Sequence, residues 1–398
     1  MRKTLRTICI LLATLLLFST CAAALDDTRT YTDDFGREVT LPLVVDKVIP
    51  SGAIALSVLI SFDPDYLASC AKGLPTNAEK YLPELAAKNL PMTGGLFTSV
   101  SDMNYEEVLN LVDRGVDVYI DVGQAKKGSA EELDKFTEKS TLASVFVSQN
   151  SLEELAPSYQ KLGQILGAEK RGNELYLYVK NWIDTIQTGM KKVEKKTACQ
   201  ITSIDGNEIS LLGGFNEDKS LGYQGMVINT LADNIVTAKG NKGTGDVYGM
   251  EAAMQLLYDK DPDFIFINGE KDHANYKAFM ENAAFKDLKA VKNGNVYEIP
   301  NYCPYLWTAS PFSGLGVCGF IWMANVMYPE TFNYDVKEKV KEFYKVMLNY
   351  NMTDDEYNEL TLYSTPKEQP KTQTKSPCPL FGLLAGFAAA AVVVCRKL

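Results

Sequence analysis

Histidine is nearly absent from this chain of 398 residues, since His273 is the only one. Receptors for bare zinc or manganese use several histidine ligands, so such a receptor is a poor candidate. An enzyme with a serine or cysteine nucleophile is also unsupported, because no G-x-S-x-G motif occurs and no cysteine lies at a recognisable spacing from His273. The glycine-rich segment 240–246 lacks the spacing of a phosphate-binding loop. We therefore expect neither catalysis nor a cofactor.

Basic residues are fewer than acidic ones. The chain has 40 lysines and arginines against 50 acidic residues, for a net charge of −10. Nucleic acid is therefore excluded as a partner. An apolar content of 46 % with 23 % charged residues is typical of a folded protein, and the length suits two domains.

Cysteines are few, and none forms a C-x-x-C pair. Of eight, four lie in the terminal segments, which leaves Cys70, Cys199, Cys303 and Cys318. A disulfide between Cys303 and Cys318 and a set of four buried free thiols are both compatible with this pattern.

The first 24 residues have the pattern of a secretory signal peptide. Basic residues precede an apolar run over residues 8–18, and Ala22 to Ala24 offer a cleavage site. Lipid attachment at Cys21 is the alternative, although the residues before it fit a lipobox poorly. The folded part is therefore expected outside the cytoplasm.

The other end has the pattern of a membrane tether. Residues 364–379 form a polar linker rich in proline, threonine and lysine. Residues 380–398 contain about seventeen apolar residues, near the lower limit for a membrane span, and end in a basic pair. This tail resembles the sorting signals of archaeal surface proteins, which implies a helix that is either retained or replaced by a lipid. Both alternatives anchor the protein to the outer face of the cell membrane.

A long amphipathic helix is predicted at the centre of the chain, over residues 168–196. Apolar residues recur there at three- and four-residue steps, and no proline interrupts them. Strands alternate with helices on both sides, which predicts an α/β fold of two parallel-sheet lobes joined by this helix. We place the lobes at residues 25–150 and 197–363, with the connecting segment at 151–196.

Ligands of parallel sheets lie at the carboxyl ends of the strands, where glycine allows the backbone to approach closely. In the first lobe these positions are Gly52, Gly94, Gly95 and Gly123. In the second lobe Gly214 follows a predicted strand at 209–212. Aromatic side chains near these ends suit a large, flat or chelated ligand. The candidates are Phe97, Phe215, Tyr223, Tyr302, Tyr305 and Trp307. Direct ligation of ferric iron by Tyr302, Tyr305 and carboxylates stays open.

Several segments, in order and spacing, resemble the substrate-binding proteins of ABC importers for iron-siderophores, cobalamin and haem. These are YTDDFGREVTLP from Tyr31, MNYEEVLNLVDRGVDVYIDVG from Met103, LGQILGAEKRGNEL from Leu162, YGMEAAMQLLYDKDPDFIFING from Tyr248 and NVYEIPNYCPYLW from Asn295. The resemblance implies two lobes on one rigid helix, little opening between them, and no chemistry on the ligand. It also implies a monomer that captures a metal chelate or corrinoid and delivers it to an ABC permease.

In that family one exposed glutamate on each lobe docks onto arginines of the permease. The matching positions are Glu106 and Glu251, with Glu107 the nearest competitor for the first. Without the resemblance, both would be ordinary glutamates at the solvated start of a helix. A receptor for another small solute, and a structural or adhesive surface protein, are the remaining alternatives.

Overall fold

The computed structural model describes residues 27–74, 77–96, 102–124, 128–149, 151–213, 225–236, 246–300, 307 and 314–366. Contacts divide the chain into two units, residues 1–365 and 366–398, and the first is described below. Within the described ranges, no helix has the length and apolar character needed to cross a membrane. The predicted signal peptide and the predicted anchor lie outside these ranges.

The N-terminal lobe begins with an antiparallel hairpin, β1 (Thr28–Thr32) and β2 (Glu38–Pro42). The buried carboxylate of Asp33 closes its turn by accepting hydrogen bonds from the backbone N–H groups of Phe35 and Arg37. A three-stranded parallel sheet follows, in the order β3-β4-β5. Its strands are β3 (Val48–Pro50), β4 (Val118–Gly123) and β5 (Ser144–Ser148).

Helices cover this sheet. They are α2 (Ala53–Ile60), α3 (Ala78–Tyr81), α4 (Pro83–Ala87), α5 (Tyr105–Asp113) and α6 (Ser129–Ser140), with a 3₁₀ turn η1 (Pro64–Tyr66). Beside β3 the chain forms only single bridges, Val48 with Leu67 and Cys70 with Met92. After the second bridge, Gly94 adopts φ +67°, and its N–H donates to the carbonyl of Ala71.

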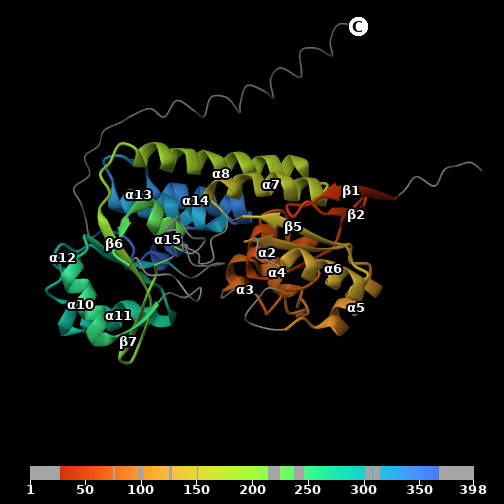
Figure 1. The fold of residues 1–398 in the computed structure, drawn as a ribbon. Coiled ribbons are helices and arrows are strands. Elements are labelled where there is room, and N and C mark those ends of the chain that lie inside the picture. The colour runs from red at the N-terminus through yellow and green to blue at the C-terminus, as the bar shows by residue number, and fades with distance from the viewer. Residues whose placement is uncertain are drawn as a thin grey trace, which may run out of the picture. The chain divides into compact units, whose positions relative to one another are not determined.

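Two helices packed side by side, α7 (Leu152–Leu166) and α8 (Glu169–Met190), connect the lobes (Figure 1). The predicted long helix is present but shorter than expected. It ends at Met190 after 22 residues, about 33 Å. A Cβ at Gly172 would lie 2.7 Å from the carbonyl oxygen of Tyr159 and 2.9 Å from the Cα of Gly163. Glycine at this crossing therefore allows the two backbones to touch.

The C-terminal lobe has a mixed sheet in the order β11-β10-β6-β7-β9, with β8 also paired to β6. Its strands are β6 (Thr197–Asp205), β7 (Glu208–Leu211), β8 (Asp233–Asn234), β9 (Asp246–Gly249), β10 (Phe264–Asn268) and β11 (Val296–Ile299). The α/β class and the two lobes are confirmed. The expectation of a second sheet with the same parallel pattern is wrong in part, because β6 was missed and β7 forms an antiparallel hairpin with it.

Helices again cover the sheet and close the unit. They are α9 (Met226–Leu231), α10 (Met250–Lys260), α11 (Ala274–Glu281), α12 (Lys289–Lys292), α13 (Val317–Met327), α14 (Val336–Leu348) and α15 (Asp354–Leu360). Short 3₁₀ turns η2 (Lys271–His273), η3 (Ala283–Phe285) and η4 (Gly314–Gly316) lie between them.

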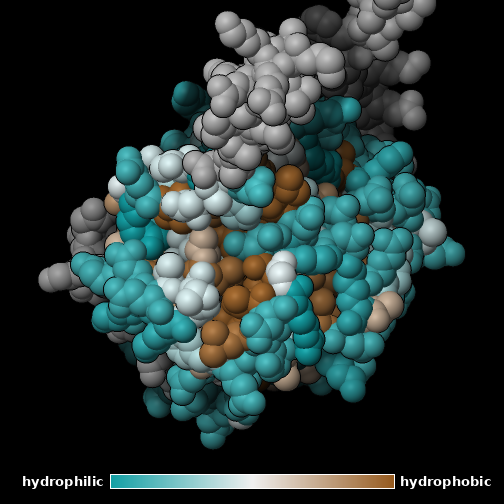
Figure 2. Space-filling model, turned by 90° about the vertical axis from the view of Figure 1, so that its right-hand side faces the viewer, coloured by the Kyte–Doolittle hydropathy of each residue, from teal (hydrophilic) through white to brown (hydrophobic). Residues whose placement is uncertain are grey.

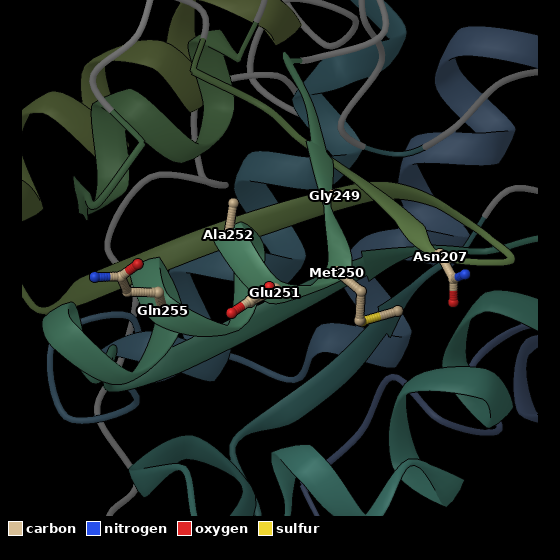
Figure 3. A pocket seen from close by; sticks show the side chains of 6 residues that line it. All are labelled: Asn207, Gly249, Met250, Glu251, Ala252 and Gln255. Atoms are coloured by element: carbon tan, nitrogen blue, oxygen red, sulfur yellow. The ribbon is translucent and has the colours of Figure 1, made fainter.

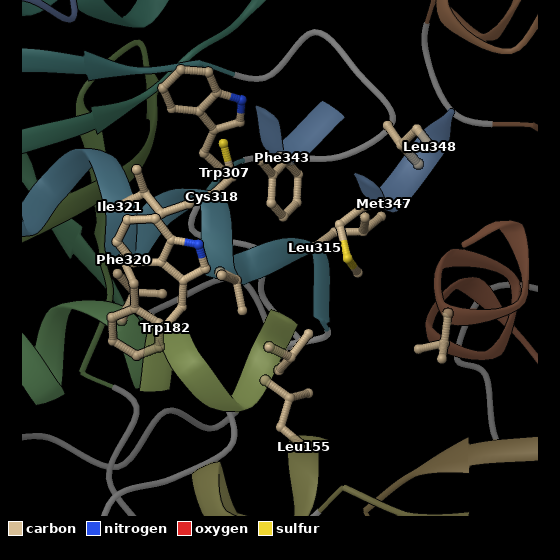
Figure 4. Close-up of a cluster of buried hydrophobic side chains, with 14 of the residues drawn as sticks. Leu155, Trp182, Trp307, Leu315, Cys318, Phe320, Ile321, Phe343, Met347 and Leu348 are labelled. Carbon is tan, nitrogen blue, oxygen red and sulfur yellow. The ribbon is translucent and has the colours of Figure 1, made fainter. Parts of the chain in front are cut away.

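One apolar core runs through both lobes. It contains Val48, Ile120 and Val147 from the first sheet as well as Phe264 and Phe266 from the second. Figure 4 shows part of it, with side chains from α7, α8, η4, α13 and α14. Each lobe also has a smaller core of its own under its outer helices. Because the large core is shared, the lobes are built to move little against each other.

Arg171 on α8 ties the two lobes together through hydrogen bonds. Its guanidinium donates to the carbonyl of Ser61, at the end of α2, at 2.7 Å, and to that of Val346, in the last turn of α14, at 2.6 Å. Both carbonyls lie at the negative end of a helix dipole, where a cation is favourable. One side chain therefore caps a helix of the N-terminal lobe and a closing helix together.

The face shown in Figure 2 is mostly hydrophilic, with apolar side chains gathered near its centre. Four large apolar side chains of the N-terminal lobe are exposed by more than 40 %. They are Leu43, Val44, Met92 and Leu109.

Candidate functional site

The carboxyl ends of β3 and β4 meet at one edge of the first sheet, as predicted for Gly52 and Gly123. Gly52 is the N-cap of α2, and Gly123 is the last residue of β4. Gly123 has a φ of +153°, which residues other than glycine rarely adopt. Between them, the hydroxyl of Ser51 donates to the carboxylate of Asp121, and both side chains are buried. This pair was not predicted, although an acid inside the apolar segment VYIDV was a signal for it.

The loop that contains Gly94 and Gly95 contacts the same strand. A Cβ at Gly94 would lie 2.0 Å from the carbonyl oxygen of Asp102, so only glycine fits there. The backbone N–H of Leu96 donates to the hydroxyl of Tyr119, two residues before Asp121 on β4. The structure thus gathers three glycine-bearing loops at one edge. Phe97, the next predicted residue, lies outside the described residues.

Trp307 was expected to face the cleft, and the structure places its side chain in the core instead. The indole is 2 % exposed, donates from Nε1 to the hydroxyl of Tyr344 at 3.1 Å and packs edge-on against Trp322. Its aromatic surface is therefore already used for packing. The other predicted aromatic residues of the second lobe, Phe215, Tyr223, Tyr302 and Tyr305, lie outside the described residues, as does Gly214.

The reason for expecting Gly214 and Phe215 at a carboxyl edge does not hold. Strand β7 runs antiparallel to β6, pairing Glu208 with Asp205 and Leu211 with Ile201. Its end therefore points toward the amino ends of the parallel strands. The carbonyl of Gly213 accepts a hydrogen bond from the buried side chain of Asn229 at 2.8 Å, which holds the chain in that direction.

The carboxyl edge of β10 and β11 contains the only histidine. Nδ1 of His273 lies 2.5 Å from Oε2 of Glu298, a side chain that is 1 % exposed, and Tyr363 packs edge-on against the imidazole. Burial raises the pKa of Glu298 above its ordinary value, although the bond from His273 acts in the opposite direction. Within the described ranges, which include this edge, no group of three or more His, Cys, Asp or Glu side chains could hold a metal ion.

The described cysteines are reduced in the structure. Cys70, Cys199 and Cys318 are buried free thiols, so Cys318 is not joined in the disulfide that the sequence allowed. Cys303 lies outside the described residues. Burial raises the pKa of Cys199 to about 12, which makes it unreactive as a thiolate.

The two predicted docking glutamates occupy equivalent places. Glu106 is the second residue of α5 and Glu251 the second residue of α10, and both are exposed. Each helix leads into a buried parallel strand, β4 or β10. Glu107 is only partly exposed, and its backbone N–H donates to the side chain of Asn104 at the start of α5. Glu106 is therefore the more exposed of the two candidates for the first position.

An open hollow lies beside Glu251. Its lining residues are Asn207, Gly249, Met250, Glu251, Ala252 and Gln255 (Figure 3). Asn207, in the turn between β6 and β7, accepts a hydrogen bond on its carbonyl from the backbone N–H of Met250 at 2.6 Å. The hairpin thus fixes the start of α10.

A family model described as "Periplasmic binding protein" matches residues 102–303, just over half of the chain. This chain belongs to the periplasmic binding protein family. Members are extracytoplasmic solute-binding proteins that deliver ligands to ABC permeases, and are not enzymes. No curated protein matches the chain significantly.

Solved structures show the same fold. An ABC transporter solute-binding protein from Sulfurospirillum deleyianum superposes with a TM-score of 0.70 at 19 % identity, over 83 % of this chain and 98 % of that chain. The molybdate-binding protein MolA of Haemophilus influenzae gives 0.60 at 16 % identity, over 82 % and 99 %. The petrobactin-binding protein YclQ from Bacillus subtilis gives 0.54 at 18 % identity, over 78 % and 100 %. At such identities these likenesses describe the fold alone.

Proposed function

We propose that this periplasmic binding protein captures a metal chelate or a corrinoid outside the cell and docks onto its ABC permease through Glu106 and Glu251. The observation that carries the docking proposal is their equivalent position, at the second residue of α5 and of α10. Neither carboxylate forms an ion pair with any described residue, so both are available to a cationic partner. A permease with two related surfaces would meet one acid from each lobe.

A chelated metal is proposed over a bare metal ion because the described residues lack a set of metal ligands. A bare transition metal needs several side-chain ligands, and the described residues offer no such group. A ligand whose metal is already coordinated needs only shape and hydrogen bonds from the protein. Proteins of similar structure bind molybdate and petrobactin, so this fold accepts both small oxyanions and large chelates. We propose that glycine backbone at positions 52, 94, 95 and 123 forms one side of the site.

Asp121 refines the choice among chelates. A buried carboxylate beside Ser51 at the ligand edge disfavours an anionic group nearby, because two negative charges of low solvent exposure repel strongly. A neutral or cationic hydroxamate chelate, or a corrinoid, therefore suits this edge better than a ferric catecholate. The predicted residues Phe97, Phe215, Tyr223, Tyr302 and Tyr305 stay part of the proposal, while Trp307 is proposed to act through packing.

The membrane tether remains part of the proposal as well. A signal peptide at 1–24 and an anchor or sorting signal at 380–398 would hold the receptor at the outer face of the membrane, next to its permease. Cleavage mapping by mass spectrometry of the protein purified from membranes tests both ends. Mature protein beginning at residue 1, or released freely from washed membranes, would contradict this part.

The function itself is tested by separating ligand binding from docking. Calorimetric titration with ferric hydroxamates, ferric catecholates, haem, corrinoids and molybdate should give saturable sub-micromolar binding for one class. The charge-reversed variant E106K/E251K should keep that affinity and lose uptake into vesicles that contain the permease. Equal uptake by variant and parent would rule out docking through these acids. Silence with every ligand would favour another small solute or a structural role on the cell surface.

A further inference from the structure

Besides the proposed docking glutamate, helices α5 and α10 have two further features in common. In α5 the sequence from Glu106 reads EEVLN, and in α10 the sequence from Glu251 reads EAAMQ. Three residues after the acid each helix has a long apolar side chain, Leu109 or Met254. Four residues after it each has a carboxamide, Asn110 or Gln255. Residues three and four apart lie on one face of a helix, so acid, apolar side chain and amide are neighbours.

Both amides are presented to solvent. Asn110 and Gln255 are exposed, and neither side chain forms a hydrogen bond with the described residues. Gln255 and Glu251 line the same hollow, which places them on the same side of α10 (Figure 3). Leu109 is 43 % exposed, so part of its side chain is accessible to a partner. Met254 is partly buried against the outer core of its lobe.

Folding explains only part of this repetition. The helix dipole favours an acid in the first turn, which accounts for the glutamates. The packed positions also match, since Val108 and Ala253 are both buried two residues after the acid, and the buried Leu111 and Leu257 follow five and six residues after it. The amides are exposed in both helices, so neither the dipole nor the core requires them, and a common partner would explain their recurrence.

The chemistry of this pattern fits an arginine. A guanidinium is planar and has five N–H donors, more than one carboxylate can accept, whereas a lysine has three donors on a single nitrogen. The carbonyl oxygen of an amide one helical turn away can accept a further N–H, and an apolar neighbour can cover the aliphatic stem of the arginine. A negatively charged helix start supplies the charge complementarity.

We propose that Asn110 and Gln255 are docking residues, each of which completes with Glu106 or Glu251 a two-residue acceptor for one arginine of the permease. This inference rests on the proposed function, since it assigns further contacts to the same docking surface. Leu109 and Met254 pack against the aliphatic part of the same side chain. The surface therefore distinguishes arginine from lysine, which a lone glutamate does less well.

The test uses the permease reconstituted in nanodiscs together with the full chain, and measures both the dissociation constant and the stimulation of ATP hydrolysis. The variant N110L/Q255M keeps side-chain size and favours helix, so the fold is retained. Each lost hydrogen bond to a charged group should weaken docking about tenfold, and the double variant about a hundredfold. The matched control is Asn181→Leu, an exposed amide on α8 far in sequence from both acids, which should bind like the parent.

The second arm replaces the permease arginines with lysine. The parent protein should lose affinity, whereas N110L/Q255M should lose little more, because the amides contribute only when a guanidinium is present. Docking of N110L/Q255M within twofold of the parent, or an equal lysine penalty for both proteins, would overturn the inference. If E106K/E251K also docks normally, the proposed docking function fails with it. If N110L/Q255M docks like the parent while E106K/E251K does not, the assignment of the glutamates stands without that of the amides.

Discussion

Each lobe has a helix with a similar exposed face, but the sheets behind these two helices differ. In the N-terminal lobe α5 precedes β4 in a sheet of three parallel strands, and in the C-terminal lobe α10 precedes β10 in a mixed sheet with an antiparallel hairpin. The start of α5 is fixed by the side chain of Asn104, while the start of α10 is fixed by the carbonyl of Asn207. Different contacts thus fix the starts of two helices whose exposed faces are similar.

The largest effect on stability is expected from Gly172→Ala, which disturbs the helix pair on which both lobes depend. The new methyl group would meet backbone atoms of Tyr159 and Gly163 at under 3 Å. Alanine favours a helix by up to about 1 kcal/mol over glycine, but overpacking should outweigh that gain and leave a net loss of about 2 kcal/mol. Urea denaturation measures it. The control is Gly249→Ala, where a Cβ meets nothing within 4 Å and stability should hold. Equal stability of the two variants would contradict the close crossing.

Arg171→Met should uncouple the two lobes while leaving α5 and α10 unchanged. The change removes a charged donor from the carbonyls of Ser61 and Val346 and should cost about 2 kcal/mol in the free energy of unfolding. The exposed neighbour Lys170→Met is the control and should be near neutral. Hydrogen exchange should accelerate at the ends of α2 and α14 alike. Acceleration confined to one of these helices would show that Arg171 does not link them.

Asn104→Ala should destabilise α5 and leave α10 unchanged. Loss of the N-cap bond to Glu107 should cost about 1 kcal/mol and loosen the first turn of α5, with no change in α10. Asn104→Asp keeps the acceptor and should restore the parent's stability. Amide exchange at Glu106 and Glu107 reports the effect. Unchanged exchange in the alanine variant would mean that packing alone fixes this helix.

The smallest effect concerns pH and only the C-terminal lobe. Because burial raises the pKa of Glu298, the folded state holds its proton more tightly than the unfolded state does. The stabilisation from this group is therefore present below its ordinary value of 4.5 and is lost as pH rises through the folded pKa. Glu298→Gln should remove that decline from a plot of the melting temperature against pH. A parallel decline in both proteins would assign it to another group.

Asp263, in the same lobe, should make stability depend on pH in the opposite direction. Burial would raise its pKa, but hydrogen bonds from Lys289 and Thr197 lower it below 3.8. Stability from Asp263 is present above that value and falls as the solution becomes more acidic. Asp263→Asn should therefore flatten the acid side of the same plot, where Glu298→Gln has no effect.

Hydrophobic patterning was enough to predict the two lobes and the connecting helix, because each rests on local periodicity. The extent of the helix was not predictable to its last turn, since residues 191–196 retain the pattern while the chain turns into β6. The direction of β7 was missed because a strand's sequence carries no mark of its partner's orientation. The core position of Trp307 was missed for a related reason. An aromatic residue beside a cleft and one inside a core have the same local sequence.

The docking role proposed for Glu106 and Glu251 comes from the family resemblance, whereas the role proposed for the amides rests on a pattern that the two helices share. Asp121 and Ser51 come from segments seventy residues apart, and only the parallel pairing of β3 with β4 brings them together. Sites of this kind are decided by tertiary register, which no local pattern encodes.

The most direct test of the central claim is a charge exchange between the two partners. Transport should be lost when Glu106 and Glu251 become arginine, and lost again when the permease arginines become glutamate. It should return when the two altered proteins are combined, because the attraction is restored with its direction reversed. Recovery of uptake would show that these two acids meet those arginines. Failure of the combined pair, with ligand affinity and folding intact, would contradict docking through Glu106 and Glu251.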